Sequence, residues 1–133
     1  WAFALSESQF MGTSIQDQLW QLQRQIILDL AEKESCVIVG RCADVILKGH
    51  ADCLTAFIHA QKDKRAKRIV EVYGETEVAI DKRIRDKDKR RAVYYEFYTG
   101  QTWGLAENFH LALDSGELGI DTCVAILADL YQR

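Results

Sequence analysis

The chain has 133 residues, of which 48% are hydrophobic and 28% charged, and its net charge is −3. These values are those of an ordinary globular domain, which excludes a disordered chain or a fibrous repeat. No apolar run approaches the roughly 20 residues of a membrane span and the start lacks a signal peptide's basic residues, so we expect one cytoplasmic domain over residues 1–133.

An amphipathic helix is predicted first, at about residues 15–33. Leu19, Leu22, Ile26 and Leu30 recur at helical spacing, while polar side chains fill the opposite face. This apolar stripe needs a surface to pack on, so we expect it to face a core.

Three short apolar runs then predict β-strands at residues 36–39, 54–59 and 110–114. Helical patterns lie between and after them: a short one after Arg41, then about 62–73, about 76–98 and about 120–132. Strands separated by helices favour an α/β fold with a parallel sheet. Three strands make a thin sheet and the chain begins at Trp1, so we expect an upstream segment that holds a further strand.

The cysteines at positions 36, 42, 53 and 123 include no C-x-x-C pair, and no histidine lies near them at zinc-ligand spacing. No metal site is therefore predicted. Cys36 and Cys53 border apolar runs, where a free cysteine is expected to behave as a small buried hydrophobic residue.

The positive charge is concentrated in one part of the chain. Residues 61–91 hold twelve of the seventeen Lys and Arg and seven acids, a balance of +5 that leaves −8 for the rest. This distribution favours a local anion site over a general nucleic-acid-binding surface.

The helix predicted at about 76–98 carries an unusual stripe, which begins with Ile80 and Ile84 and continues through Asp88 and Arg91 toward Tyr95 and Tyr98. Charged groups on an inward face need partners. Two interpretations are open: Asp88 and Arg91 pair with each other, or they bind a ligand. Arginines hold phosphate oxygens in a two-pronged geometry, and Arg83, Arg85, Arg90 and Arg91 all lie near Asp88, so a phosphate ligand is a reasonable hypothesis.

Gly40 and Arg41 directly follow the run at 36–39. Ligands of open parallel sheets bind beyond the carboxyl ends of the strands, so a charged side chain there points to a site. The alternative is an exposed arginine that begins the next helix.

Three blocks of sequence resemble the cytidylate kinase-like family: residues 36–44, residues 88–104, and residues 111–115 with 118–120. The similarity runs from about Trp20 to the C-terminus. It implies a P-loop NTPase-like parallel sheet flanked by helices, with a helical lid at about 74–91, and transfer of the terminal phosphate of ATP to a nucleoside monophosphate such as CMP.

The resemblance also implies roles for particular residues. The Gly40-Arg41 turn would hold the acceptor phosphate, and Asp44, the acid nearest to Arg41, would belong to the substrate site. Asp88 and Arg91 would bind the acceptor's sugar and phosphate. Arg83, Arg85 and Lys87 would belong to the lid over the donor phosphates, with Ile84 where better-studied kinases carry another arginine.

No G-x-x-x-x-G-K-[ST] loop occurs in the chain. In the family this loop lies upstream of the matching region, so the first strand, loop and first helix are expected there, ATP and Mg²⁺ would bind through that segment, and the chain by itself is expected to be inactive. Two alternatives remain: a non-catalytic nucleotide-binding protein, and an RNA-binding domain that stacks bases on Tyr94, Tyr95 and Phe97.

Overall fold

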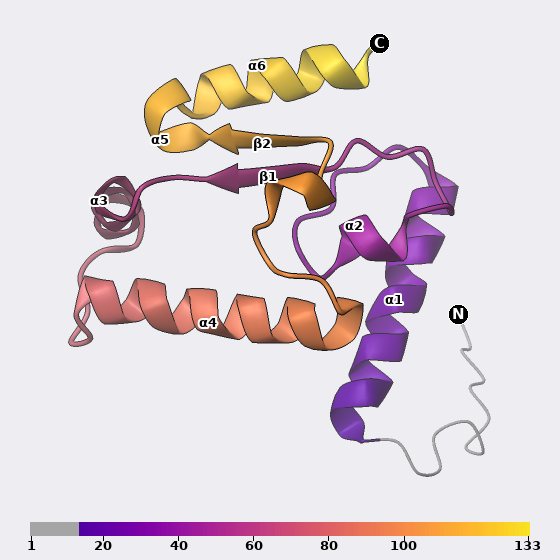
Figure 1. Cartoon of the computed structure of the whole chain (residues 1–133), viewed down its shortest axis with the longest axis horizontal. Helices are drawn as coiled ribbons and strands as arrows, with labels where there is room; N and C mark the ends of the chain where they lie inside the picture. The colour runs from indigo at the N-terminus through magenta and orange to yellow at the C-terminus, as the bar shows by residue number, and fades with distance from the viewer. Residues whose placement is uncertain (1–13) are drawn as a thin grey trace. The chain divides into compact units, whose positions relative to one another are not determined.

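The computed structural model describes residues 14–133, and Figure 1 shows the arrangement of its helices and strands. The chain divides into two compact units, Trp1–Asp52 and Cys53–Arg133, which are described separately. The expectations of a single domain and of a lid at about 74–91 stay predictions.

The first unit contains helix α1, Ile15–Lys33, with the bounds that the sequence predicts, and helix α2, Ala43–Ile46, which packs against it. Ser14 caps α1, because its hydroxyl oxygen accepts a hydrogen bond from the backbone N–H of Asp17 at 3.1 Å. Asp17 also places a negative charge in the first turn, which the helix dipole favours.

The apolar stripe of α1 is not buried as expected. Leu19 is 60% exposed and Ile26 52%, and Leu22 and Leu30 are also exposed, whereas Ile27 on another face is buried. The periodicity predicted the helix correctly but not its buried face. The helix that packs against α1 within the described part of this unit is the four-residue α2, which is too short to cover a stripe that runs almost the whole length of α1.

The predicted strand at 36–39 is also wrong. This segment has no strand assignment, and Val37 and Val39 are 92% and 88% exposed. A strand needs a neighbouring backbone to satisfy its N–H and C=O groups, and no segment in the described part of the unit pairs with this one. Cys36 is exposed for the same reason, and it is not the buried thiol that the sequence predicts.

The second unit is built on a pair of parallel strands, β1 at Ala56–His59 and β2 at Leu111–Asp114. They match the runs predicted at 54–59 and 110–114, which confirms a mixed fold with a parallel sheet. Within residues 14–133 the sheet has two strands and is accompanied by six α-helices. The narrower expectation of a P-loop NTPase fold stays a prediction.

A histidine extends the pairing beyond the start of both strands. The backbone N–H of His110 donates to the carbonyl of Thr55 at 3.1 Å, and the N–H of Thr55 donates to Nδ1 of His110 at 3.0 Å. Next to this pair, Phe57 packs edge-on against Trp103 and at a tilt against Phe109, with ring centroids 5.7 and 5.2 Å apart. The strands are thus fixed at their amino-terminal ends by an imidazole and an aromatic cluster.

Two helices follow β1: α3, Lys62–Tyr73, and α4, Ile80–Thr99. The bounds of α3 are those predicted, since Gly74, at φ 76°, ends the helix in a conformation that glycine adopts readily. Helix α4 begins four residues later than expected and buries Ile84 and Tyr95. After a short 3₁₀ helix, Ala106–Asn108, and β2, the chain ends with α5, Ser115–Leu118, and α6, Ile120–Tyr131.

Candidate functional site

The α3 and α4 helices are joined by a two-pronged ion pair between Arg65 and Asp88. Nη1 of Arg65 donates to Oδ2 of Asp88 and Nη2 donates to Oδ1, both at 2.7 Å. The two side chains are 29% and 25% exposed. Two short parallel bonds between ionised groups form a strong and geometrically specific contact, so Asp88 is held in one orientation.

Arg91 makes a weaker contact with the same carboxylate, from Nη1 to Oδ1 at 3.3 Å, and its side chain is 56% exposed. The ion pair expected within the helix therefore exists, but it is secondary. The hydrogen bonds from Arg65, and then the charges of Arg65 and Arg91, hold the pKa of Asp88 below its usual range. The same pairing with Asp88 raises the pKa of Arg65.

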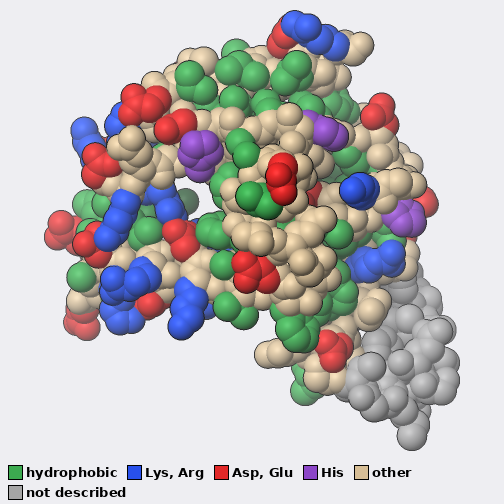
Figure 2. Space-filling view, viewed as in Figure 1, with side chains coloured by type: hydrophobic (Ala, Val, Ile, Leu, Met, Phe, Trp, Pro, Cys, Tyr) green, Lys and Arg blue, Asp and Glu red, His purple; other side chains and the backbone are tan. Residues whose placement is uncertain are grey.

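A cavity of about 290 Å³ opens between α3 and α4 beside this pair. Its walls combine four cationic side chains with apolar and aromatic ones, and Asp88 is the carboxylate bonded to two of the cations. Figure 2 shows Lys and Arg side chains gathered over this part of the second unit. The cavity, called the α3–α4 pocket below, is lined by Arg65, Ile69, Tyr73, Arg83, Ile84, Lys87 and Arg91.

Positive charge thus exceeds negative charge in the pocket, which suits an anion with several oxygens, such as a phosphate group. The predicted residues Arg83, Lys87 and Arg91 all line it, and predicted Asp88 is bonded to the lining residues Arg65 and Arg91. Nη1 of Arg83 also donates to the carbonyl of Gly74 at 3.0 Å, which ties α4 to the end of α3. Arg85 is exposed and is not among the lining residues.

Sequence reasoning missed three residues of the pocket, Arg65, Ile69 and Tyr73. The signal was present, because Arg65, Ile69 and Tyr73 are spaced by four residues and lie on one face of α3. That stripe forms one wall of a pocket only together with α4, and the sequence of α3 does not predict which helix lies beside it.

Arg41 and Asp44, the other predicted site residues, belong to the first unit. Arg41 is exposed, and it follows Gly40 in a turn where three successive residues, Gly40, Arg41 and Cys42, have φ of 72°, 57° and 59°. Non-glycine residues rarely adopt this left-handed conformation, which costs roughly 1–2 kcal/mol per residue. Strain of this kind occurs most often at functional sites, so the turn supports a role for Arg41.

The thiol of Cys42 in this turn is expected to be unreactive. Burial raises its pKa to about 11, the Asp44 carboxylate adds to the rise, and Arg41 opposes it. The thiol therefore stays protonated at neutral pH and is not a nucleophile.

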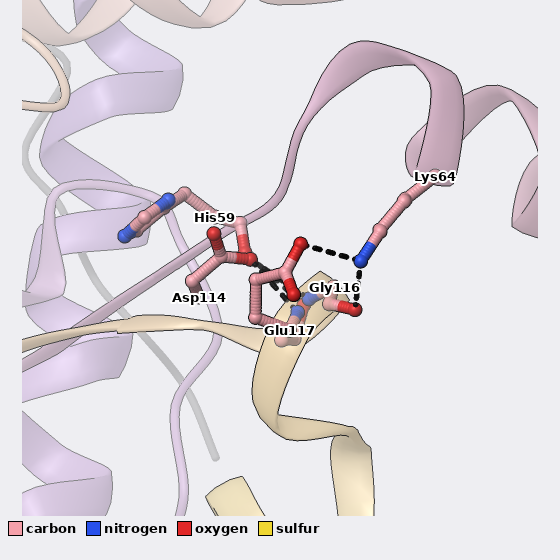
Figure 3. A network of polar contacts seen from close by, with 6 residues as sticks. His59, Lys64, Asp114, Gly116 and Glu117 are labelled. Atoms are coloured by element: carbon pink, nitrogen blue, oxygen red, sulfur yellow. Dashed lines mark hydrogen bonds and ion pairs between the residues drawn. The ribbon is translucent and has the colours of Figure 1, made fainter.

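The carboxyl ends of the two strands carry a separate polar network, shown in Figure 3. His59 and Asp114 are partners in the strand register there. Asp114 caps the following turn, because its Oδ1 accepts the N–H groups of Gly116 at 2.9 Å and of Glu117 at 3.2 Å. Lys64 reaches from α3 to the Gly116 carbonyl and the Glu117 carboxylate. These contacts fasten α5 to α3 and are structural.

The aromatic residues of α4 are mostly engaged with the protein itself. Tyr95 is buried at 6% exposure and donates to Oε1 of Gln101 at 3.0 Å. Tyr94 packs on Tyr98 with ring centroids 4.9 Å apart, whereas Phe97 is 73% exposed. Tyr95 cannot stack a nucleobase in this conformation, so the surface considered for RNA lacks one of its three platforms.

A parallel strand pair with helices around it, together with the α3–α4 pocket, defines an α/β protein with a cationic pocket. The chain belongs to the cytidylate kinase-like family, whose model matches residues 1–117. This confirms the resemblance and indicates a nucleotide-kinase-like function.

A solved structure has the same fold. The chain is similar to an uncharacterized protein from Eubacterium ventriosum ATCC 27560, with 32% identity and a TM-score of 0.80 over 97% of this chain and 73% of that chain. No curated protein matches the chain. No helix in the described part is both long and apolar enough to cross a bilayer.

Proposed function

We propose that this chain is the acceptor-binding and lid part of a nucleotide kinase, which transfers the terminal phosphate of MgATP to a nucleoside monophosphate of the CMP type. The observation that carries the proposal is the α3–α4 pocket, which is lined by four cationic side chains, two of which, Arg65 and Arg91, bond to the carboxylate of Asp88. Membership of the cytidylate kinase-like family supports the choice of a nucleotide as the ligand.

The chemistry asks mainly for positioning and charge neutralisation. In phosphoryl transfer, the terminal phosphoryl group leaves ADP and joins an oxygen of the acceptor phosphate, and negative charge is spread over the phosphate oxygens throughout. Arg91 and Lys87 can neutralise that charge from α4. Asp88, fixed by Arg65, is the natural acceptor for a sugar hydroxyl, because an ionised carboxylate accepts but does not donate hydrogen bonds.

The donor side needs groups that these residues do not supply. Within residues 14–133 no three His, Cys, Asp or Glu side chains are grouped so that they could hold a metal ion. The Gly-rich loop that would cradle ATP and position Mg²⁺ is absent from the 133 residues. The described residues therefore fit the phosphate groups of a nucleotide but not the metal.

Arg41 and Asp44 keep their proposed roles at the acceptor. The left-handed turn supports this, because a conformation that costs stability is retained where the side chain it carries is needed. In the proposal Arg41 binds the acceptor phosphate, and Asp44 contributes to recognition of the acceptor.

The test is a coupled ADP-release assay on a protein that extends upstream through the phosphate-binding loop, with MgATP and a panel of nucleoside monophosphates. Arg91→Ala removes one charge-assisted phosphate contact, so we expect kcat/KM to fall about 10- to 100-fold. Thermal melting should show that the variant stays folded, because Arg91 is mostly exposed and Arg65 still holds Asp88.

Arg90→Ala is the matched control. Arg90 is the neighbouring exposed arginine, bonded through Nε to the backbone carbonyl of Asp86 at 3.3 Å and absent from the pocket lining. Its loss should leave turnover nearly unchanged. If none of the monophosphates stimulates ADP release, the proposed kinase activity is refuted. Tight nucleotide binding without ADP release would favour the non-catalytic nucleotide-binding protein.

A further inference from the structure

The two ends of the α3–α4 pocket are lined by different side chains. Arg65 and Tyr73 are eight residues apart on one face of α3, which separates their Cα atoms by about 12 Å. Helix α4 crosses α3, which Figure 1 shows end-on while α4 lies in the plane of the view. Asp88 of α4 bonds to Arg65, and Arg83 bonds to Gly74, directly after Tyr73. The pocket therefore extends along α3 from Arg65 to Tyr73.

One end is suited to phosphate and the other to an aromatic ring. Arg65 and Arg91 meet around Asp88 at the first end. At the second end Tyr73 stands beside Arg83, whose guanidinium is tethered by the Gly74 carbonyl. A tyrosine ring and a guanidinium plane are both surfaces on which a flat heterocycle stacks.

The middle of the pocket is apolar. Ile69 lies one turn from Tyr73 on α3, and Ile84 faces it from α4 and is buried at 5% exposure. A purely inorganic phosphate site would gain nothing from these side chains. Tyr73 itself is 76% exposed, so its ring is available to a ligand in the pocket.

We propose that the α3–α4 pocket binds a single nucleotide, with its phosphate at the Arg65 and Arg91 end and its base stacked on Tyr73 beside Arg83. This inference rests on the proposed function in taking a nucleotide as the ligand, and it assigns Tyr73 as the residue that recognises the base. A volume of about 290 Å³ is at the small end of ligand pockets, which suits one mononucleotide.

The test compares ligands that share phosphate and sugar but differ in the base. Calorimetric titration of the 133-residue chain uses CMP, AMP and ribose 5-phosphate. Stacking on an aromatic side chain is expected to make the nucleotides bind about 10- to 100-fold more tightly than ribose 5-phosphate. Tyr73→Ala should abolish this difference and leave the affinity for ribose 5-phosphate unchanged, and Tyr73→Phe should restore it.

Tyr131→Ala is the control, because Tyr131 is a similarly exposed tyrosine at the end of α6 and is absent from the pocket lining. Equal affinity for CMP, AMP and ribose 5-phosphate would overturn the role of Tyr73 while leaving the anion site intact. Failure of all three ligands to bind would overturn both the pocket and the proposed function. Binding that depends on Tyr73, in a protein that transfers no phosphate, would refute the kinase and uphold this inference.

Discussion

Replacing Asp88 with asparagine should weaken the second unit in a way that depends on pH. The change keeps the size of the side chain but removes the charge that receives two 2.7 Å hydrogen bonds from Arg65. Hydrogen bonds to charged groups contribute about 1.5–3 kcal/mol each, but an amide still accepts one of them. Because both side chains are about a quarter exposed, water offsets part of the loss, so we expect a decrease of about 1–2 kcal/mol at pH 7.

The direction of the pH dependence follows from the lowered pKa of Asp88. A carboxyl group whose pKa is lower in the folded state stabilises the fold fully above its unfolded pKa, about 3.9 for aspartate. That contribution is lost as the pH falls through the folded value. The unfolding free energies of the wild-type protein and Asp88→Asn should therefore differ by a constant amount at pH 5–7, and the difference should begin to shrink as the pH falls below about 4.

The measurement is urea unfolding followed by circular dichroism, from pH 3 to pH 7, for the wild-type protein, Asp88→Asn and Asp129→Asn. Asp129→Asn serves as the control, since its ion pair with Arg133 lies in an exposed position and should contribute less than about 0.5 kcal/mol. A difference between wild type and Asp88→Asn that stays constant below pH 4 would refute the assignment of this stability to the charged pair.

Two further changes test the packing around the strands. Gly116→Ala would place a Cβ 2.9 Å from Cδ of Lys64, so the melting temperature should fall with a cost of about 1–3 kcal/mol; an unchanged melting temperature would show that the α3–α5 contact is loose. His110→Phe leaves the N–H of Thr55 without its Nδ1 acceptor and should cost about 1 kcal/mol in chemical denaturation. His110→Asn offers an oxygen in a similar place, and equal losses in the two variants would argue against this bond.

The sequence predicted elements well where local signals define them. Helices α1 and α3 have the predicted bounds, because the capping residue Ser14 and the terminating residue Gly74 mark their ends. The strand predicted at 36–39 is wrong, because apolar composition indicates a tendency toward burial but does not supply a partner strand. Val37 and Val39 are instead exposed.

The candidate site shows the same limit. Spacing along one helix correctly indicated that Arg91 could reach Asp88, three residues away. It could not find Arg65, the stronger partner, which is 23 residues away on another helix. That contact depends on how the chain between Gly74 and Ala79 directs α4 across α3, and helical periodicity contains no information about such a turn.

The left-handed turn at Gly40, Arg41 and Cys42 has a consequence for protein engineering. Glycine adopts this conformation without steric cost, so at the exposed position Arg41→Gly is the substitution that a screen for thermostability would select in this turn, whereas Cys42→Gly would lose a buried side chain. Selection for heat resistance alone would then discard the guanidinium proposed to hold the acceptor. A thermostable variant of this protein should therefore keep Arg41 and gain its stability from substitutions outside the turn, because at this turn stability and ligand recognition favour different residues.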